Sequence, residues 1–209
     1  MKTLLDLKNW NRKEHFEHFS KMEEPFFGVT VEIDCTKAYQ TAKNLKTSFF
    51  IFYLHKTLVA VNSVENFKYR IAENQIYINE RIDASATIGR KDDTFGFSLM
   101  EYNADYKIFE KNAQAEIDRI QNTTGLFTRS FDDDNLIHFS AIPWLNFTSI
   151  SHARSYSYPD SCPKISFGKM MTSETGKKTM AMSVNVHHGL IDGLHVGKFV
   201  ELFQELMNQ

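Results

Sequence analysis

The sequence lacks several features that would place it in a specialised class of protein. It has only two cysteines, Cys35 and Cys162, and no signal-peptide character at its start, so we expect two free thiols in a reducing compartment in preference to one disulfide. Its formal net charge is −2 without a basic stripe, which argues against a nucleic-acid partner. The most apolar stretch, 49–61, is shorter than the roughly 20 residues of a membrane span and contains His55 and Lys56. We therefore expect a cytoplasmic protein that does not enter a membrane.

Internal repeats, low-complexity tracts and an evident linker are also lacking, and 209 residues suit one domain over residues 1–209. Hydrophobic residues make up 42% of the chain and charged residues 24%, as in ordinary globular proteins. Eighteen phenylalanines are a heavy aromatic load, which indicates a substantial core and large contacts between subunits.

Hydrophobic periodicity predicts helices interspersed with short strands. Ser48 is a candidate cap for the apolar helix that follows it. This pattern favours an α/β fold in which helices pack against a mostly antiparallel or mixed sheet. The expected helices are 10–19, 37–43, 49–61, 105–121 and a closing helix after Gly193; the expected strands are 27–33, 67–71, 75–78, 94–100, 136–142, 146–151, 164–171 and 179–186.

Two adjacent histidines follow the last predicted strand. A strand end and a tight turn closed by Asp192-Gly193 would hold an imidazole in one orientation, and the ordinary pKa of imidazole lies near neutrality. Neighbouring residues in a strand point to opposite faces, so one of His187 and His188 should face a cavity and the other the packed interior. A lone histidine at such a place is more often structural than catalytic, and Asp-Gly by itself would be a turn and helix cap.

A metal site is the alternative for this motif, because His187, His188, Asp192 and His195 are all ligand types. Their spacing matches neither the His-Glu-x-x-His helix nor a cysteine-containing zinc site, so we expect no metal.

Four segments stand out in chain order: Asn-Trp-Asn-Arg-Lys-Glu-His-Phe at 9–16, the Pro-Trp-x-x-Phe segment with its following serine within 140–149, Phe-Gly-Lys at 167–169 and His-His-Gly-Leu-Ile-Asp-Gly at 187–193. Together they resemble the chloramphenicol acetyltransferase branch of the CoA-dependent acyltransferases. Their order, their spacing and the overall length agree with the family, so the resemblance covers essentially the whole chain. It implies a two-layer α/β sandwich with helices on one face of the sheet, a homotrimer with active sites between subunits, and acetyl-CoA as co-substrate.

The resemblance also implies roles for individual residues. His188 would be the general base that takes the proton of an acceptor hydroxyl, which attacks the thioester directly without an acyl-enzyme. Asp192 would pair with Arg12 and hold the turn that bears the histidine, and Ser149 would donate a hydrogen bond to the tetrahedral oxyanion. Without the resemblance, Arg12 would be a solvated charge and Ser149 an ordinary strand-end serine. The remaining assignments are Phe19 and Phe95 as acceptor-pocket walls, Ser166 near the intermediate, Lys169 as a contact to a CoA phosphate in the absence of a Gly-rich loop, and Trp144 as a packing residue.

Chloramphenicol, acetylated at its primary hydroxyl, is the acceptor that the resemblance implies. The departures from the family pattern are Leu194 in place of an aromatic, Gly189 in place of alanine or serine, and the acids Glu23 and Glu24, which would favour a cationic or more polar acceptor if they point inward. The alternatives are another small hydroxylated acceptor, a dihydrolipoyl acyltransferase core without its lipoyl domain and linker, and a non-catalytic trimeric binding protein.

Overall fold

The computed structural model of the protein describes residues 1–131, 134–154 and 160–209. Its framework is a mixed sheet in which β7 runs parallel to β5 and β8 while the other pairs are antiparallel. The strands, in their order across the sheet, are β2 (Phe26–Asp34), β10 (Lys178–His187), β8 (Lys164–Phe167), β7 (Leu136–Ala141), β5 (Asp83–Gly89) and β6 (Phe95–Phe97), with the short β9 (Met171–Thr172) also on β10.

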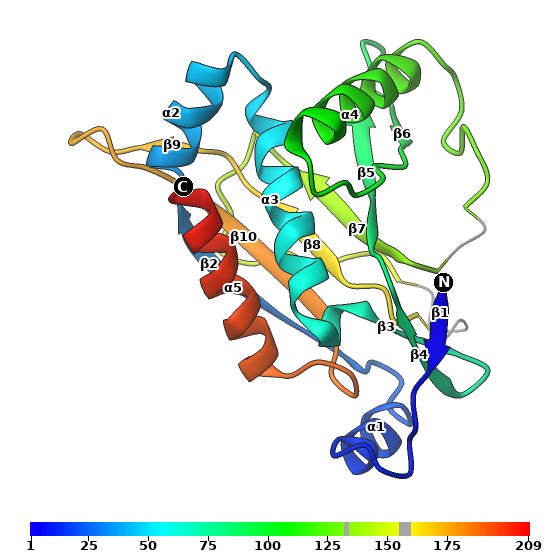
Figure 1. Ribbon diagram of the computed structural model, residues 1–209. Helices are drawn as coiled ribbons and strands as arrows, with labels where there is room; N and C mark the ends of the chain where they lie inside the picture. The colour runs from blue at the N-terminus through cyan, green and yellow to red at the C-terminus, as the bar shows by residue number, and fades with distance from the viewer. Residues whose placement is uncertain (132–133, 155–159) are drawn as a thin grey trace.

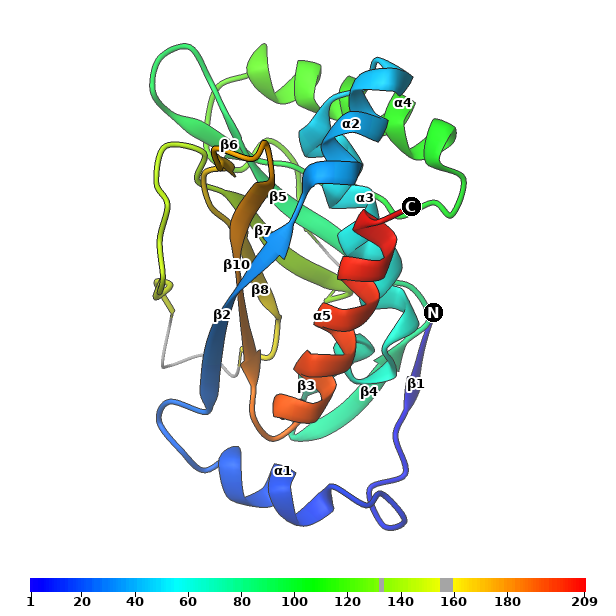
Figure 2. The ribbon, with the colours of Figure 1, turned by 90° about the vertical axis from the view of Figure 1, so that its left-hand side faces the viewer.

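Four helices cover one face of this sheet, as Figures 1 and 2 show from two directions. At the centre lies α3, whose apolar circumference is buried as expected, and its Tyr53 contacts Phe139 of β7 and Phe167 of β8. The two-layer α/β class predicted from the sequence is therefore confirmed. The helices are α2 (Thr36–Leu45), α3 (Phe49–Ser63), α4 (Tyr106–Gln121) and α5 (Gly193–Met207).

A small second sheet has the order β1 (Lys2–Leu4), β4 (Gln75–Asn79) and β3 (Tyr69–Ala72), and the 3-10 turn η1 (Glu65–Lys68) leads into it. The predicted hairpin is present, and it turns at Glu73 and Asn74, which both have positive φ. The short α1 (Lys13–Phe19) lies beyond one end of the main sheet, where the backbone of Phe16 approaches the turn between β10 and α5.

Several sequence predictions of local structure were wrong. Residues 146–151 form no strand, since their backbone has no neighbouring strand with which to pair. Ser48 occupies the cap position of α3 but makes no side-chain capping bond. At α4, by contrast, the Asp105 carboxylate accepts hydrogen bonds from the backbone amides of Lys107 (2.8 Å) and Ile108 (3.3 Å). Both cysteines are free thiols, as expected, and no helix of the described ranges is long and apolar enough to cross a membrane.

The alternation of β7 and β8 gives the sheet two different faces. Ile137, Phe139, Ile165 and Phe167 are buried in the core on the helix side. Because side chains alternate along a strand, the residues between them point to the opposite face. These are His138 and Ser140 on β7 and Lys164 and Ser166 on β8, paired in register as His138 with Lys164 and Ser140 with Ser166.

Candidate active site

His188 lies in the turn between the end of β10 and the start of α5, and aromatic rings hold its imidazole. Phe19 of α1 is stacked on the imidazole at 4.0 Å between ring centroids and 8° between planes, and Phe27 of β2 lies at 4.5 Å. The backbone amide of His188 donates to the carbonyl of Pro25 at 2.8 Å. Among the described residues, Nδ1 of His188 is buried without a hydrogen-bond partner. Packing rather than hydrogen bonding therefore orients this imidazole.

Arg12 ties together the two ends of the turn that carries His188. One guanidinium nitrogen forms an ion pair with the Asp192 carboxylate, and the other donates to the carbonyl oxygen of His188 at 3.1 Å. The Arg12 side chain is only 9% exposed. Burial alone would raise the pKa of Asp192, but the contacts with His195 and Arg12 outweigh it and lower that pKa. The two residues that the family resemblance paired are thus in direct contact, with Asp192 charged at neutral pH.

Asp192 also begins helix α5. Its carboxylate accepts from the backbone amides of Leu194 (3.0 Å) and His195 (3.4 Å). In return, Nδ1 of His195 accepts from the backbone amide of Asp192 at 3.2 Å, which completes a reciprocal capping box. The carboxylate therefore lies where the positive end of the helix favours a negative charge, as well as beside Arg12.

His187 has a different environment from its neighbour. It is buried, its Nδ1 accepts a hydrogen bond from the backbone amide of Gly189 at 3.1 Å, and its ring lies edge-on to Phe26. Burial, followed by the charge of Arg154, lowers the pKa of His187 to about 4. A Cβ at position 189 would lie 3.0 Å from Cε1 of His187, which explains the glycine there. His187 is the packed histidine of the pair, and His188 is the one held at the end of the strand.

A cavity of about 530 Å³ lies on the face of the sheet that carries His138, Ser140, Lys164 and Ser166. One part of its lining is aromatic and the other is polar. Phe95 and Ser166, two of the residues predicted to contact the acceptor, are both in it. Its lining residues are Phe95, Phe97, Phe127, Phe131, Leu136 and Phe139, then Ser85, Thr87, His138, Ser140, Lys164, Ser166 and His152, with Ala153.

Other predicted site residues lie elsewhere. Neither His188 nor Phe19 lines this cavity, so the described part of one chain keeps the imidazole and the cavity apart. Ser149 is exposed on the loop after β7 and does not line the cavity either. Lys169 is exposed, and its backbone amide donates to the carbonyl of Leu145 at 2.7 Å. Sequence reasoning missed Ser140, His138 and Lys164, although polar residues at every second position of β7 and β8 were a usable signal. It also missed His152, which lies on the loop between these strands and which no periodic pattern marks.

One of the two acids that would favour a cationic acceptor, Glu24, is held in an ion pair. Glu24 pairs with Arg154 and also accepts from the backbone amide of Phe26 at 2.9 Å. The Arg154 guanidinium lies 3.6 Å from the centre of the Phe26 ring. Glu23 is exposed. Glu24 therefore stabilises the loop and does not offer a free carboxylate to a cationic ligand.

Cys162 and Asp160, which do not line the cavity, contact two residues of its polar wall: Cys162 contacts His138, and Asp160 contacts Lys164. Burial would raise the pKa of the Cys162 thiol, but the adjacent His138 outweighs it and lowers that pKa, and the same contact raises the pKa of His138. Lys164 is buried, and its ammonium donates to the Asp160 carboxylate at 2.5 Å and to the carbonyl of Cys162 at 3.2 Å. Burial lowers the pKa of His152, so this imidazole is neutral at pH 7.

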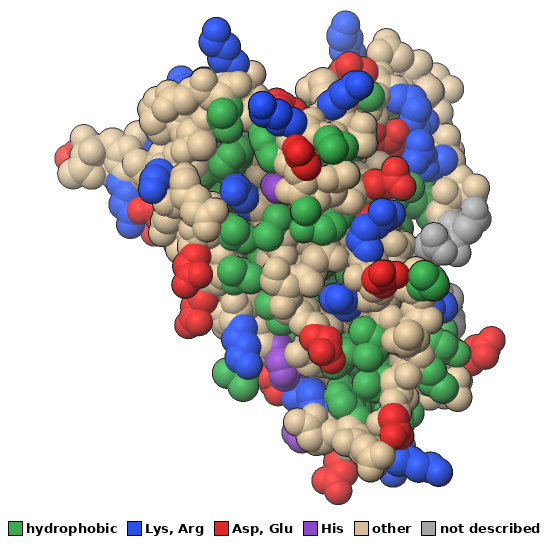
Figure 3. Space-filling model, viewed as in Figure 1, with side chains coloured by type: hydrophobic (Ala, Val, Ile, Leu, Met, Phe, Trp, Pro, Cys, Tyr) green, Lys and Arg blue, Asp and Glu red, His purple; other side chains and the backbone are tan. Residues whose placement is uncertain are grey.

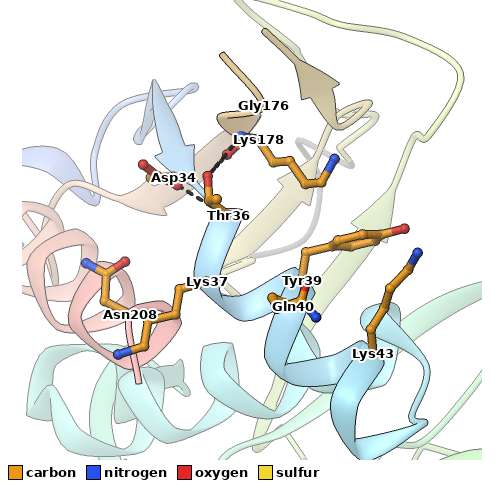
Figure 4. Close-up of a pocket in the computed structure, with 9 residues that line it drawn as sticks. All are labelled: Asp34, Thr36, Lys37, Tyr39, Gln40, Lys43, Gly176, Lys178 and Asn208. Carbon is orange, nitrogen blue, oxygen red and sulfur yellow. Dashed lines mark hydrogen bonds between the residues drawn. The ribbon is translucent and has the colours of Figure 1, made fainter. Parts of the chain in front are cut away.

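A second hollow lies between α2 and the start of β10, at the opposite end of β10 from His188 (Figure 4). The ammonium groups of Lys43 and Lys178 each lie 5.0 Å from the centre of the Tyr39 ring. Acidic and basic side chains are interspersed over the face of the molecule in Figure 3, in keeping with the lack of a basic stripe in the sequence.

Comparisons with known proteins show which family and which fold the chain resembles. The family model described as chloramphenicol acetyltransferase matches residues 1–204. A chloramphenicol acetyltransferase of Campylobacter coli is 29% identical over 209 residues, which cover 99% of both chains. A solved structure of a chloramphenicol acetyltransferase superimposes with a TM-score of 0.90 at 30% identity, covering 99% of this chain and 100% of that one. A probable dihydrolipoamide acetyltransferase from Listeria monocytogenes shares the fold with a TM-score of 0.68 at 15% identity, over 93% of this chain and 88% of that one.

Proposed function

The chain belongs to the chloramphenicol acetyltransferase family, and on that basis we propose that it transfers the acetyl group of acetyl-CoA to the primary hydroxyl of chloramphenicol. It is an acyltransferase. The observation that carries the proposal is the His188 imidazole, which packs against Phe19 and Phe27 on a turn that the Arg12–Asp192 pair holds. Since acetyl-CoA is made and used in the cytoplasm, we place the reaction there.

His188 acts as the general base of this reaction. Because Nδ1 is buried, Nε2 is the ring nitrogen that we assign to proton transfer. It removes the hydroxyl proton as the oxygen attacks the thioester carbon, which forms a tetrahedral intermediate with a negatively charged oxygen. Collapse of the intermediate expels the CoA thiolate, which takes the proton from the imidazolium and leaves His188 neutral again. The acetyl group passes directly to the acceptor, and no step requires a metal ion.

A serine hydroxyl stabilises the oxyanion of that intermediate. The sequence pointed to Ser149, but the position of Ser140 favours it for this role, because it lines the cavity beside Ser166 on the adjacent strand. One well-placed donor contributes about 10²–10³ in rate. The acceptor binds in the cavity with its aromatic ring against the phenylalanine wall, and Lys169 contacts a phosphate of CoA.

A homotrimer brings the two halves of the site together. Within one chain the imidazole and the cavity are separate, so a cyclic assembly in which His188 of one subunit reaches the cavity of the next completes every site. Trp144 is 78% exposed, Leu145 60% and Phe127 68%, and such large apolar side chains are typical of a subunit contact. Light scattering that gave an active monomer at micromolar concentration would contradict this assembly.

Thiol release from acetyl-CoA tests the proposed function. The wild-type protein should release CoA when chloramphenicol is added and not when every hydroxyl acceptor is omitted, and expression should protect a sensitive bacterial host. If the protein acetylates other hydroxylated molecules but not chloramphenicol, the acceptor is wrong and the acetyl transfer stands. A non-catalytic binding protein would release no thiol with any acceptor.

A further inference from the structure

The cavity assigned to the acceptor has one aromatic wall and one wall of basic side chains. Phe95 and Phe97 of β6, with Phe127, form part of the first. His138 of β7, Lys164 of β8 and His152 of the following loop lie on the second. Among the described lining residues none is acidic. Chloramphenicol is a neutral molecule, so it brings no anionic group to the imidazoles of this wall.

The contacts of the three basic residues decide which of them can meet a ligand. Lys164 is only 5% exposed at its side chain, and Asp160 neutralises it at 2.5 Å. His138 contacts Cys162 behind the wall. Nε2 of His152 lies 3.4 Å from Oγ of Ser166, which is a weak contact. The imidazoles of His138 and His152 are therefore the groups available to a ligand, whereas Lys164 is held by its ion pair with Asp160.

An apolar acceptor that filled the cavity would remove water from these imidazoles without replacing its hydrogen bonds. A polar group left unsatisfied in a desolvated site weakens binding, because it has lost its hydrogen bonds to water. A carboxylate reverses this cost, because it accepts hydrogen bonds from imidazole N–H groups, and such charge-assisted bonds are stronger than neutral ones.

We propose that the cavity selects aromatic alcohols that carry a carboxylate, with the ring against the phenylalanine wall and the carboxylate on His138 and His152. The proposal rests on the proposed function only in taking this cavity as the acceptor site. It adds an acceptor class, aromatic hydroxy acids, to the neutral acceptor chloramphenicol, and makes His138 and His152 specificity-determining residues.

Two matched probes test the proposal: 4-(hydroxymethyl)benzoate and its carboxamide, with chloramphenicol as a third acceptor in the same thiol-release assay. We expect the wild-type kcat/KM to be at least 10-fold higher for the acid than for the amide. The His138→Phe/His152→Leu double variant should lose this ratio, chiefly through a higher KM for the acid, while its kcat/KM for chloramphenicol rises. Lys43→Ala, which removes a positive charge in the hollow of Figure 4, is the control and should leave the ratio unchanged.

Calorimetric titration of both probes in the absence of acetyl-CoA makes the same comparison without turnover, on proteins whose circular dichroism shows them to be folded. Equal affinity for acid and amide, or an undiminished preference in the double variant, overturns the proposal. Turnover of chloramphenicol with no preference for the acid overturns the selection alone and leaves the proposed function intact. Preferential binding of the acid without any turnover supports the selection and overturns the proposed function.

Discussion

Arg12 and Asp192 are 180 residues apart in the chain and form an ion pair at the base of the turn that carries His188. The pair joins the residue just before α1 to the first residue of the α5 cap. The same guanidinium donates to the His188 carbonyl, so loss of the pair changes both the stability of the fold and the position of the imidazole.

Arg12→Ala and Asp192→Ala should both destabilise the protein, but to different extents. Arg12→Ala leaves a carboxylate that is 30% exposed and still caps α5, and we expect a loss of about 2–3 kcal/mol. Asp192→Ala strands a guanidinium that is 9% exposed and removes the cap, and we expect about 3–5 kcal/mol. Urea unfolding measures both values. Asp192→Asn keeps a capping side chain and should lie between wild type and Asp192→Ala; equal losses for all three variants would contradict this account.

The two adjacent histidines should respond oppositely to substitution. His188→Ala should abolish acceptor-dependent thiol release and leave the fold and acetyl-CoA binding nearly intact, because the imidazole holds no hydrogen bond at Nδ1. His187→Ala should chiefly lower stability, since it removes a buried ring and the acceptor of the Gly189 amide. Steady-state kinetics and thermal unfolding separate the two. If His188→Ala retained more than a few per cent of the activity, the assignment of the base would be wrong.

Ser140 and Ser149, on either side of Pro143-Trp144, are the two candidates for the hydrogen bond to the oxyanion. Ser140→Ala should lower kcat by about 10²-fold, because it removes a hydroxyl from the cavity. Ser149→Ala, at an exposed position, should change kcat by less than about threefold. The opposite result would restore Ser149, and KM for acetyl-CoA shows whether either change acts through binding of the co-substrate.

Acid should destabilise the protein through His187. Its pKa is lowered to about 4 in the folded state from an ordinary value of 6.5, so below pH 6.5 the unfolded chain binds the proton and the folded chain does not. Stability is therefore present above pH 6.5 and is lost as the pH falls toward 4, by about 2 kcal/mol at pH 5. To measure the contribution of His187, the free energy of unfolding is determined at pH 7.5 and pH 5 for wild type and His187→Gln at one protein concentration. An identical pH dependence in both proteins would exclude it.

Gly189→Ala tests the close approach of the turn to His187. A Cβ there would lie 3.0 Å from the imidazole and 3.2 Å from the Cα of Phe16. We expect a loss of about 1–3 kcal/mol, as for other overpacked sites, and a lower kcat because the displaced turn carries His188. Thermal unfolding and thiol release on the same preparation check both effects. Gly176→Ala, in the β9–β10 turn, is open around its Cβ but has positive φ, so it should affect stability alone.

The local sequence determined most of the secondary structure and the chemistry of the turn. Apolar periodicity identified α3, α4 and α5, and the alternation in 136–142 and 179–186 identified β7 and β10, because periods of 3.6 and 2 are properties of neighbouring residues. The motif at 187–193 indicated an oriented imidazole. The period-2 rule, on which we expected His187 and His188 to face opposite ways, does not apply to the pair, because β10 ends at His187 and His188 lies in the turn. The same rule failed at 146–151, since a strand also needs a partner, and local sequence does not contain the partner.

Only the tertiary structure decided which distant residues share a site. Ser140 and Ser149 lie on either side of the same Pro-Trp pair, and the register of β7 with β8 places only Ser140 beside Ser166. His138 and His152 reach one cavity because a strand and the loop after it meet at one face of the sheet, and Glu24 is neutralised because a loop 130 residues away brings Arg154 to it. Such pairings depend on strand order and loop path, which arise from the packing of the whole chain. Local composition and periodicity therefore identify which groups are present, and the fold determines which of them act together.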